Sequence, residues 1–262
     1  MAGITYVMLS RICALNQLYI LEDFDETKMF PSQIALKELD RLKNISMNSN
    51  PTDWDKEDSR ILKISSLNCR SLKKHFLDIK SDDILLKSNV ICLQETWLDD
   101  GEALENFEIP NYELHLNSYG RGKGLAIYYQ KEIAKHEMDV KHENIQLSLF
   151  SCENIDLVAI YRSRNGNHEV LTQIIETLLE REKPILVIGD FNFCYNDNSS
   201  NLMGKYLSQH DFKQLVTEPT HIEGNILDHA YVHDTREINT YSMVLQSKYY
   251  SDHKGVGILA KR

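Results

Sequence analysis

The chain has 262 residues, of which 42% are hydrophobic and 26% charged, and its formal net charge is -10. These values are typical of a soluble globular protein with room for one large domain, and they argue against a broad nonspecific nucleic-acid surface. No apolar run approaches the ~20 residues that cross a bilayer, and the N-terminus lacks the residue order of a signal peptide. The five cysteines occur singly, so we expect an intracellular protein with reduced thiols.

Residues 1–43 are interpreted as a separate N-terminal piece. Two strand-like runs, 4–12 and 18–24, precede an expected amphipathic helix over 31–42. This piece is too small to be a stable domain by itself. The following stretch, 44–60, is polar and has neither helical nor strand periodicity, which predicts a linker.

The remaining residues, 61–262, are expected to form one domain. Short apolar runs predict strands over 62–67, 90–94, 124–129, 157–161, 185–189, 227–232 and 255–259. Amphipathic segments predict helices over 73–86, 170–182 and 203–210. Strands that alternate with helices favour a layered α/β domain.

Many of the expected strands end or begin at a polar residue that can bind a metal or move a proton. In α/β folds, functional sites gather where strand ends and their loops converge on one rim. Carboxylates, amides, a phenol and an Asp–His pair at one rim suit metal-assisted attack on a phosphate. The residues concerned are Asn68, Glu95, Tyr161, Arg162, Asp190, Asn192, Asp228, Asp252 and His253.

Each of these residues also has a purely structural interpretation. Turn formation and capping, which Asn and Asp favour, explain the residue types at Asn68, Asp190, Asn192 and Asp228. A solvated strand end explains Glu95 and the Asp252–His253 pair. Taken singly, the structural interpretation is the stronger one. Their shared placement at strand ends, in this order, favours a common site.

Three short motifs carry a resemblance to a known family. Gln94-Glu95-Thr96, Gly189-Asp190-Phe191-Asn192 and Ser251-Asp252-His253 resemble signatures of the endonuclease/exonuclease/phosphatase superfamily. The resemblance spans 62–259, and the second and third motifs together are its most specific part. It implies a four-layer α/β sandwich of the deoxyribonuclease I type, with two mixed β-sheets and a short N-terminal appendage. It also implies a metal-dependent phosphoric diester hydrolase.

The resemblance further implies a metal site and a catalytic set. Glu95 is expected to be the main ligand of Mg²⁺, with Asn68 and Asp252 nearby, and Mn²⁺ is an alternative because both cations accept oxygen ligands. The expected catalytic residues are Asn68, Tyr161, Asp190, Asn192, Asp228 and His253.

Individual roles within this set also follow from the resemblance. Asp190 is expected to activate or orient the attacking water, and Asn192 to stabilise charge on the phosphate oxygens. His253, held by Asp228, is expected to lie against the scissile phosphate. Tyr161 is expected near the leaving group or the phosphate.

Basic residues close to these strand ends are candidates for contact with substrate phosphates, although ordinary solvated charge explains each of them equally well. They are Arg121, Lys123, Arg162 and Arg164, with the Lys73-Lys74-His75 run as the weakest case. The segment Ile226-Leu227-Asp228-His229 departs from the Arg-x-Asp-Tyr pattern of apurinic endonucleases. It is more similar to transposon-borne nucleases, so a preference for abasic sites is in doubt.

The N-terminal piece carries a second resemblance. The run 6–11, with Leu15 and 18–20, resembles the last motif of Pif-type DNA helicases, in which the residue matching Arg11 faces the nucleotide γ-phosphate. The chain has no phosphate-binding GxxxxGK[ST] loop, so no nucleotide cofactor is expected. A helicase end followed by such a nuclease resembles Helitron-type transposon proteins.

The combined hypothesis is an intracellular, nuclear, Mg²⁺-dependent DNA endonuclease of transposon origin. One alternative is a phosphatase or phosphodiesterase of the same superfamily that acts on RNA, inositol phosphates or lipids. Another is an inactive transposon remnant. The sequence leaves target preference and oligomeric state open.

Overall fold

A computed structural model describes residues 53–55, 58–99, 101–118, 123–142, 144–166, 168–197, 202–233 and 239–261. The chain divides into two compact units, Met1–Lys56 and Glu57–Arg262. The predicted helicase-like fragment lies outside the described residues, as does most of the predicted linker apart from the short 3-10 helix η3 (Asp53–Asp55) and residues 58–60. Both therefore stay predictions, and the second unit is the one described below.

The first sheet of this unit is mixed. Its only parallel neighbours among the described strands are β1 and β2, and the other pairs are antiparallel. In spatial order its strands are β11 (Thr240–Ser247), β12 (Lys254–Lys261), β1 (Ile61–Asn68), β2 (Val90–Gln94), β4 (Leu125–Tyr129) and β3 (Glu113–Asn117).

The second sheet repeats this plan with one central parallel pair, β7 and β8, among antiparallel described neighbours. In spatial order its strands are β5 (Ala134–His142), β6 (Ile145–Cys152), β7 (Asp156–Arg162), β8 (Ile185–Asp190), β10 (Asp228–His233) and β9 (Phe212–Gln214). The parallel pair requires a crossover, which the helix α4 (His168–Leu179) supplies.

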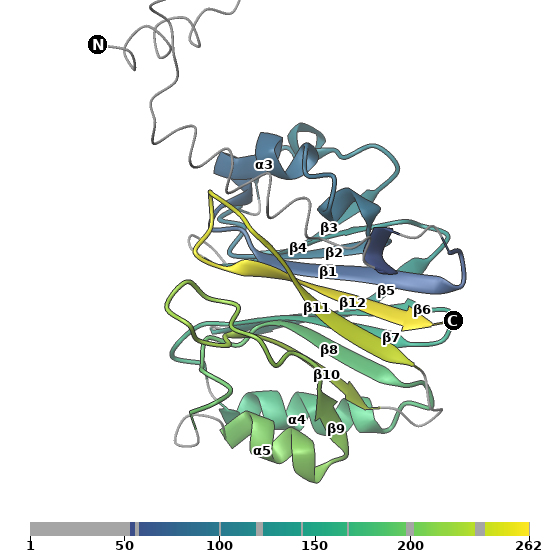
Figure 1. Cartoon of the computed structure of the whole chain (residues 1–262), viewed down its shortest axis with the longest axis vertical. Coiled ribbons are helices and arrows are strands. Elements are labelled where there is room, and N and C mark those ends of the chain that lie inside the picture. Colours follow the sequence, from purple (N-terminus) through teal and green to yellow (C-terminus); the bar gives the residue numbers. More distant parts are fainter. Residues whose placement is uncertain are drawn as a thin grey trace, which may run out of the picture. The chain divides into compact units, whose positions relative to one another are not determined.

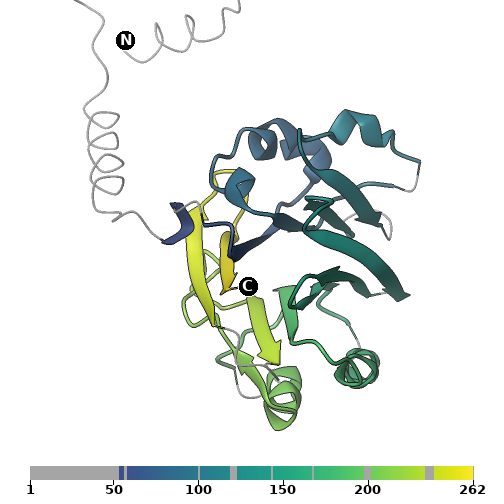
Figure 2. The same ribbon diagram turned by 90° about the vertical axis from the view of Figure 1, so that its right-hand side faces the viewer.

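The two sheets stack face to face, and helices cover their outer faces (Figures 1 and 2). The helix α3 (Leu72–Lys80) and the short 3-10 helices η4 (Leu85–Lys87) and η5 (Leu104–Phe107) lie on the first sheet, and α4 and α5 (Leu202–Gln209) on the second. Buried aliphatic side chains of both sheets form one core between them. A second core joins the outer face of the second sheet to its two helices. The predicted four-layer α/β sandwich is therefore confirmed.

The structure corrects some of the predicted elements. The helix expected over 73–86 ends at Lys80, because the chain turns at 81–84 and Asp82 accepts hydrogen bonds from the backbone of Ile84 and Leu85 at 3.0 and 3.1 Å. Five strands lacked a clear apolar run and were not predicted: β3, β5, β6, β9 and β11. The strand β11 was not predicted because it lies at a sheet edge and is only partly buried. Its Tyr241 side chain is 62% exposed.

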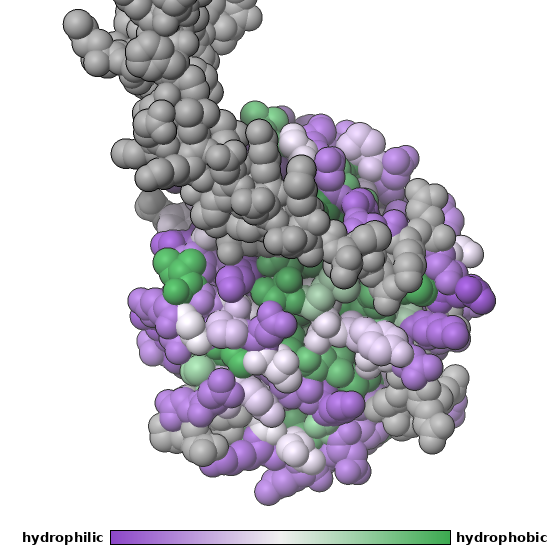
Figure 3. Space-filling model, viewed as in Figure 1, coloured by the Kyte–Doolittle hydropathy of each residue, from purple (hydrophilic) through white to green (hydrophobic). Residues whose placement is uncertain are grey.

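Surface composition varies over the face seen in Figure 3. Hydrophilic side chains dominate its periphery, and hydrophobic ones gather in its middle. None of the helices in the described ranges combines the length and apolar composition that a membrane crossing requires.

Candidate active site

Strand register brings the predicted residues to one rim of the sandwich. Asn68 ends β1 beside Gln94, the last residue of its parallel partner β2. In the second sheet, Asp190 at the end of β8 pairs with Tyr161 on one side and with Asp228 on the other. The Asn68 side-chain amide donates a hydrogen bond of 2.8 Å to Asp190 Oδ2, so the central strands of both sheets converge here.

Asp190 is fully buried at the centre of this rim. Its Oδ2 also accepts from the Asn192 side-chain amide at 3.0 Å, and its Oδ1 accepts from the Asn192 backbone N–H at 2.8 Å. The second bond closes an Asx turn, which is the structural role expected for Asp190 and Asn192. The same two side chains also lie at the rim. Burial, followed by the charge of Asp228, raises the pKa of Asp190 to about 7.

Gly189 makes this approach of strands possible. Its φ is +151°, and a Cβ at this position would lie 1.9 Å from the carbonyl oxygen of Ile160 on β7. A side chain here would push β7 away from β8 at the point where both strands reach the rim. The glycine of the GDFN motif is therefore required by backbone packing.

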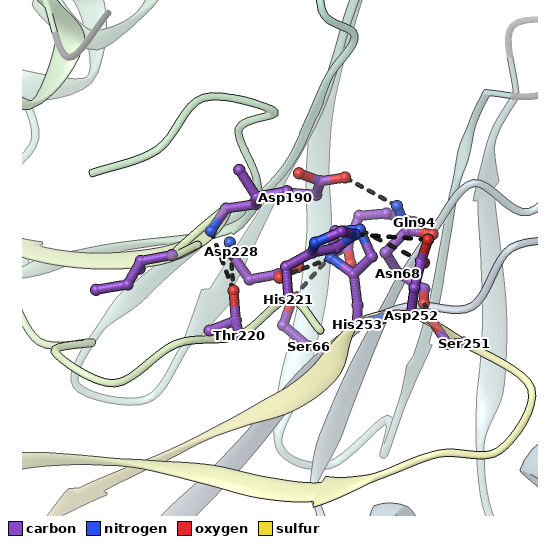
Figure 4. Close-up of polar contacts among 12 residues, drawn as sticks. Ser66, Asn68, Gln94, Asp190, Thr220, His221, Asp228, Ser251, Asp252 and His253 are labelled. Atoms are coloured by element: carbon purple, nitrogen blue, oxygen red, sulfur yellow. Dashed lines mark hydrogen bonds and ion pairs between the residues drawn. The ribbon is translucent and has the colours of Figure 1, made fainter. Parts of the chain in front are cut away.

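His253 and Asp228 form a buried pair beside Asp190 (Figure 4). His253 Nδ1 lies 2.8 Å from Asp228 Oδ2. Burial alone lowers the pKa of His253, but the charge and hydrogen bond of Asp228 outweigh it and the pKa rises to about 9. His253 is therefore protonated at neutral pH and presents a positive charge to the rim.

Two hydroxyl groups hold this pair in place. Ser251 Oγ accepts from the His253 backbone N–H at 3.0 Å and donates to the Asn68 carbonyl at 2.7 Å, which ties β12 to β1. Thr220 Oγ1 accepts from the backbone N–H groups of Leu227 and Asp228, both at 3.1 Å. Sequence analysis did not identify Thr220, because its loop is far from the motifs along the chain.

Glu95 directly follows β2 and is only partly buried. Its backbone has φ +51°, and its carboxylate accepts a hydrogen bond from Tyr161 across the two sheets. Burial, followed by the charges of Glu95 and Asp190, raises the pKa of Tyr161. The phenol therefore stays protonated and can act as a hydrogen-bond donor at this rim.

Asp252 lies at the same rim, and its two carboxylate oxygens have different partners. Its Oδ2 forms an ion pair with Arg70 at 2.7 Å and lies 3.5 Å from His221 Nε2. Its Oδ1 is buried and accepts no hydrogen bond from the described residues, and the charged His253 Nε2 lies 3.9 Å from it. A buried carboxylate oxygen without a donor fits a cation ligand. Glu95, Asn68 and Asp252 offer only oxygen donors at this rim, which is the ligand type that a cation such as Mg²⁺ prefers.

Backbone strain is concentrated in the same loops. Positive φ angles at non-glycine residues are costly and cluster at functional sites. Around the rim they occur at Arg70, Ser71, Glu95, Trp97 and Asn192.

The predicted basic residues occupy different environments. The Arg162 guanidinium is buried and donates to the carbonyls of Phe191 and Gly166 at 2.9 and 2.7 Å, so it supports the loop that carries Asn192. Its predicted contact with substrate phosphate stays a prediction. Arg164 is exposed, and its charge acts on Tyr161.

The remaining basic candidates have other partners or positions. Lys123 donates to the Asn144 side chain at 3.3 Å. Lys73 pairs with Glu102 at 2.5 Å, and Lys74 lies in the first turn of α3. Arg121 lies outside the described residues. Arg70, which sequence analysis missed, is the exposed cation that contacts the site directly.

A groove of about 500 Å³ opens beside the rim. Its lining includes Arg164, Asn192, Phe193, Leu202, His221 and Leu227. Arg162 and Glu223 also line it, so the groove combines two guanidinium groups and one carboxylate with apolar side chains.

His229, next to Asp228, is not part of the site. Its ring is fully buried and stacks on Phe191 with centroids 4.8 Å apart. Burial lowers its pKa to about 4, so it is a neutral core residue.

The fold and this rim define a hydrolase that acts on phosphate esters with a divalent metal. The chain belongs to the endonuclease/exonuclease/phosphatase family, whose model matches residues 48–253. The superfamily predicted from the three short motifs is therefore confirmed. No curated protein sequence matches the chain significantly.

Solved structures of low sequence identity share the fold. The 3′ phosphatase NExo from Neisseria, bound to product DNA hairpin, is 14% identical with a TM-score of 0.60, over 76% of this chain and 98% of that one. An AP endonuclease from Archaeoglobus fulgidus is 15% identical with a TM-score of 0.58, over 75% and 98%. The catalytic domain of human Nocturnin is 14% identical with a TM-score of 0.57, over 78% and 94%.

Proposed function

We propose that this protein is a Mg²⁺-dependent DNA endonuclease. The observation that carries the proposal is the junction of the two sheets, where Asn68 and Asn192 hold Asp190 beside the Asp228–His253 pair. This arrangement places a base, a cation and amide donors around one point, as hydrolysis of a phosphodiester requires. DNA as the substrate is supported by the structural similarity to the Neisseria 3′ phosphatase bound to product DNA hairpin and to the Archaeoglobus AP endonuclease.

Asp190 supplies the proton acceptor in this proposal. Its pKa of about 7 places it near the operating pH, where a general base is most effective. The two amides that donate to Oδ2 fix the carboxylate, so that it orients an attacking water.

His253 supplies a fixed positive charge. Asp228 holds its Nδ1, which leaves Nε2–H to donate to a phosphate oxygen. Tyr161 provides a neutral donor at the same rim. Mg²⁺ bound by Glu95, Asn68 and Asp252 would add charge stabilisation on a phosphate oxygen.

DNA contacts in this proposal are local. With a net charge of -10, the chain cannot rely on a broad basic face. Arg70 and Arg164 are exposed cations that act on rim residues, and Arg121 and Lys123 remain candidates in the loop before β4. Few phosphate contacts predict a weak dependence of binding on salt.

The origin of the chain is a separate part of the proposal. Descent from a Helitron-type transposon protein, with a helicase remnant at 1–43 and a nuclear location, rests on sequence resemblance, chiefly that of the N-terminal piece. A Walker-loop reading frame directly upstream in the genome would support it. Flanking sequence without any transposon remains would refute it.

The test is a nicking assay on supercoiled plasmid with Mg²⁺. Nicking is expected to fall at least about 1,000-fold in Asp190→Asn, because this change removes the base while keeping its size. EDTA is expected to abolish it. Asp211→Asn is the matched control, since Asp211 is exposed and has a φ of +62° that Asn accepts.

The other outcomes separate the alternatives. Nicking that survives Asp190→Asn would contradict the assignment of the site. Another outcome is a folded protein that spares DNA but cleaves RNA or releases phosphate from inositol phosphates. That result would reject DNA as the substrate and leave the family assignment unchanged. A folded protein inactive on all of these would identify an inactive remnant.

A further inference from the structure

A second group of metal-ligating side chains lies where the edge strands of the two sheets meet. His115 is on β3, at the edge of the first sheet, and His136 and Asp139 are on β5, at the edge of the second. The two edge strands contact each other. Both imidazoles point to one carboxylate: His115 Nε2 lies 3.0 Å and His136 Nε2 3.1 Å from Asp139 Oδ1.

A β-bulge creates this arrangement. In a regular strand, residues three apart point to opposite faces, so His136 and Asp139 would be separated. The pairing of β5 with β6 shifts register between His136 and Met138, and the extra residue restores both side chains to one face. The geometry therefore depends on a specific irregularity of β5.

A hydroxyl group and an aromatic floor support the cluster. Ser148, opposite Asp139 on β6, donates to Asp139 Oδ1 at 2.7 Å and orients the carboxylate. The two imidazole rings stack with centroids 3.8 Å apart, and both contact the buried ring of Phe150 edge-on. Carboxylates of metal sites are commonly held by such hydrogen bonds.

The distances approach those of a metal site. Two ligand atoms bound to one Zn²⁺ at ~2.0–2.1 Å in a tetrahedron lie roughly 3.3 Å apart. The observed N–O separations are 3.0 and 3.1 Å, and one ligand atom from each of the three residues lies within 4.8 Å of the others. The side chains are 20–29% exposed, so an ion can enter from solvent.

We infer that His115, His136 and Asp139 form a second metal site, selective for a borderline transition-metal cation such as Zn²⁺. Two imidazoles and one carboxylate suit Zn²⁺ rather than Mg²⁺, which prefers oxygen ligands. The fourth position is left to water. A metal here joins the edge strands of the two sheets, so its main effect is on stability.

This site is separate from the catalytic rim. Asp139 pairs with Ser148, and Ser148 with Ala159, two residues before Tyr161 reaches the rim. The corresponding positions of the first sheet are His115, Ile127 and Cys92, two residues before Gln94. The cluster thus lies back from the rim along the strands, at the side of the sandwich where the edge strands β3 and β5 meet.

Zn²⁺ titration of the chelator-treated full chain, in excess Mg²⁺, tests the inference. Calorimetry is expected to show one strong site, and Co²⁺ in its place the visible absorption of a tetrahedral complex. His136→Gln and His115→Gln are each expected to weaken binding at least about 100-fold, because even residues that only support metal ligands contribute about 10–100-fold. Zn²⁺ is also expected to raise the melting temperature of the wild type and not of these variants.

His142→Gln is the matched control, because His142 is an exposed histidine on the same strand outside the cluster. It is expected to bind Zn²⁺ as the wild type does. Circular dichroism verifies that each variant is folded. Zn²⁺ affinity unchanged in His136→Gln, or binding lost in His253→Gln instead, would overturn the site. So would the absence of a strong site in the folded wild type, which would leave the cluster as a hydrogen-bonded contact between strands.

Discussion

The two halves of the catalytic rim differ in how deeply their side chains are buried. In one half, Asp190, Asp228 and His253 are at most 5% exposed, and hydrogen bonds hold each of them, although Asp228 Oδ1 accepts none from the described residues. In the other half, which consists of Glu95 after β2 and Asp252 in the loop before β12, both carboxylates are partly exposed. An ion pair with the exposed Arg70 holds one oxygen of Asp252, and the other has no donor among the described residues.

This difference separates two tasks. Buried, fixed groups act on a reacting atom without reorganisation, which is how enzymes stabilise developing charge. Incompletely satisfied oxygens are suited to exchange their partner for a cation. We therefore expect changes in the first half to affect turnover, and changes in the second to affect the metal requirement.

The largest effect is expected for Asp228→Asn. The amide cannot stabilise the protonated ring of His253, whose positive charge depends on the Asp228 carboxylate. Turnover in the nicking assay is expected to fall about 10³–10⁴-fold, as for loss of the carboxylate in other His–Asp pairs. The Mg²⁺ concentration for half-maximal rate is expected to stay the same.

Asp211→Asn controls for the change from carboxylate to amide, because Asp211 is exposed and remote in chain position from the motifs. It should nick at the wild-type rate. If the Asp228→Asn enzyme regains the wild-type rate at high Mg²⁺, Asp228 acts through metal binding. That result would contradict the division of tasks between the two halves.

Glu95→Gln addresses the other half. Removing a charged oxygen ligand weakens Mg²⁺ binding, so the Mg²⁺ concentration for half-maximal nicking is expected to rise about 10–100-fold. Part of the lost rate should return at high Mg²⁺. A rate loss that Mg²⁺ cannot relieve, with unchanged metal affinity, would show that Glu95 is not a metal ligand and acts in catalysis instead.

Much of this site could be predicted because short-range signals coincide with it. GDFN combines a glycine that backbone packing requires with an Asx turn and a strand end, and SDH places a histidine directly at the start of a buried strand. Core strands such as β2 and β8 are continuous apolar runs, and these also mark their ends.

The missing parts depend on contacts that no local pattern encodes. Arg70 reaches Asp252 across 182 positions of sequence, and the bulge that unites His136 and Asp139 is defined only by pairing with β6. Arg162 is predicted to contact substrate because it follows Tyr161, and the sequence does not show that its guanidinium donates to the carbonyls of Phe191 and Gly166. Polar edge strands such as β5 carry no apolar run, because one face meets solvent.

The smallest effect concerns the pH dependence of the buried half. His229 lies behind Asp228, and burial lowers its pKa from 6.5 to about 4 in the folded chain. Because the unfolded chain binds the proton first, its neutral ring contributes stability above pH 6.5, and this contribution is lost as the pH falls toward 4.

Between pH 7 and pH 5 this residue alone is expected to reduce the free energy of unfolding by about 2 kcal/mol, from the two pKa values and their linkage to folding. Urea unfolding at both pH values measures it. His229→Phe retains a ring against Phe191 but cannot titrate, so its stability should depend less on pH by that amount, whatever its absolute value. His142→Gln removes an exposed histidine and should leave the pH dependence of the wild type. If His229→Phe also leaves it unchanged, the acid sensitivity of this half arises from the Asp190, Asp228 and His253 group instead.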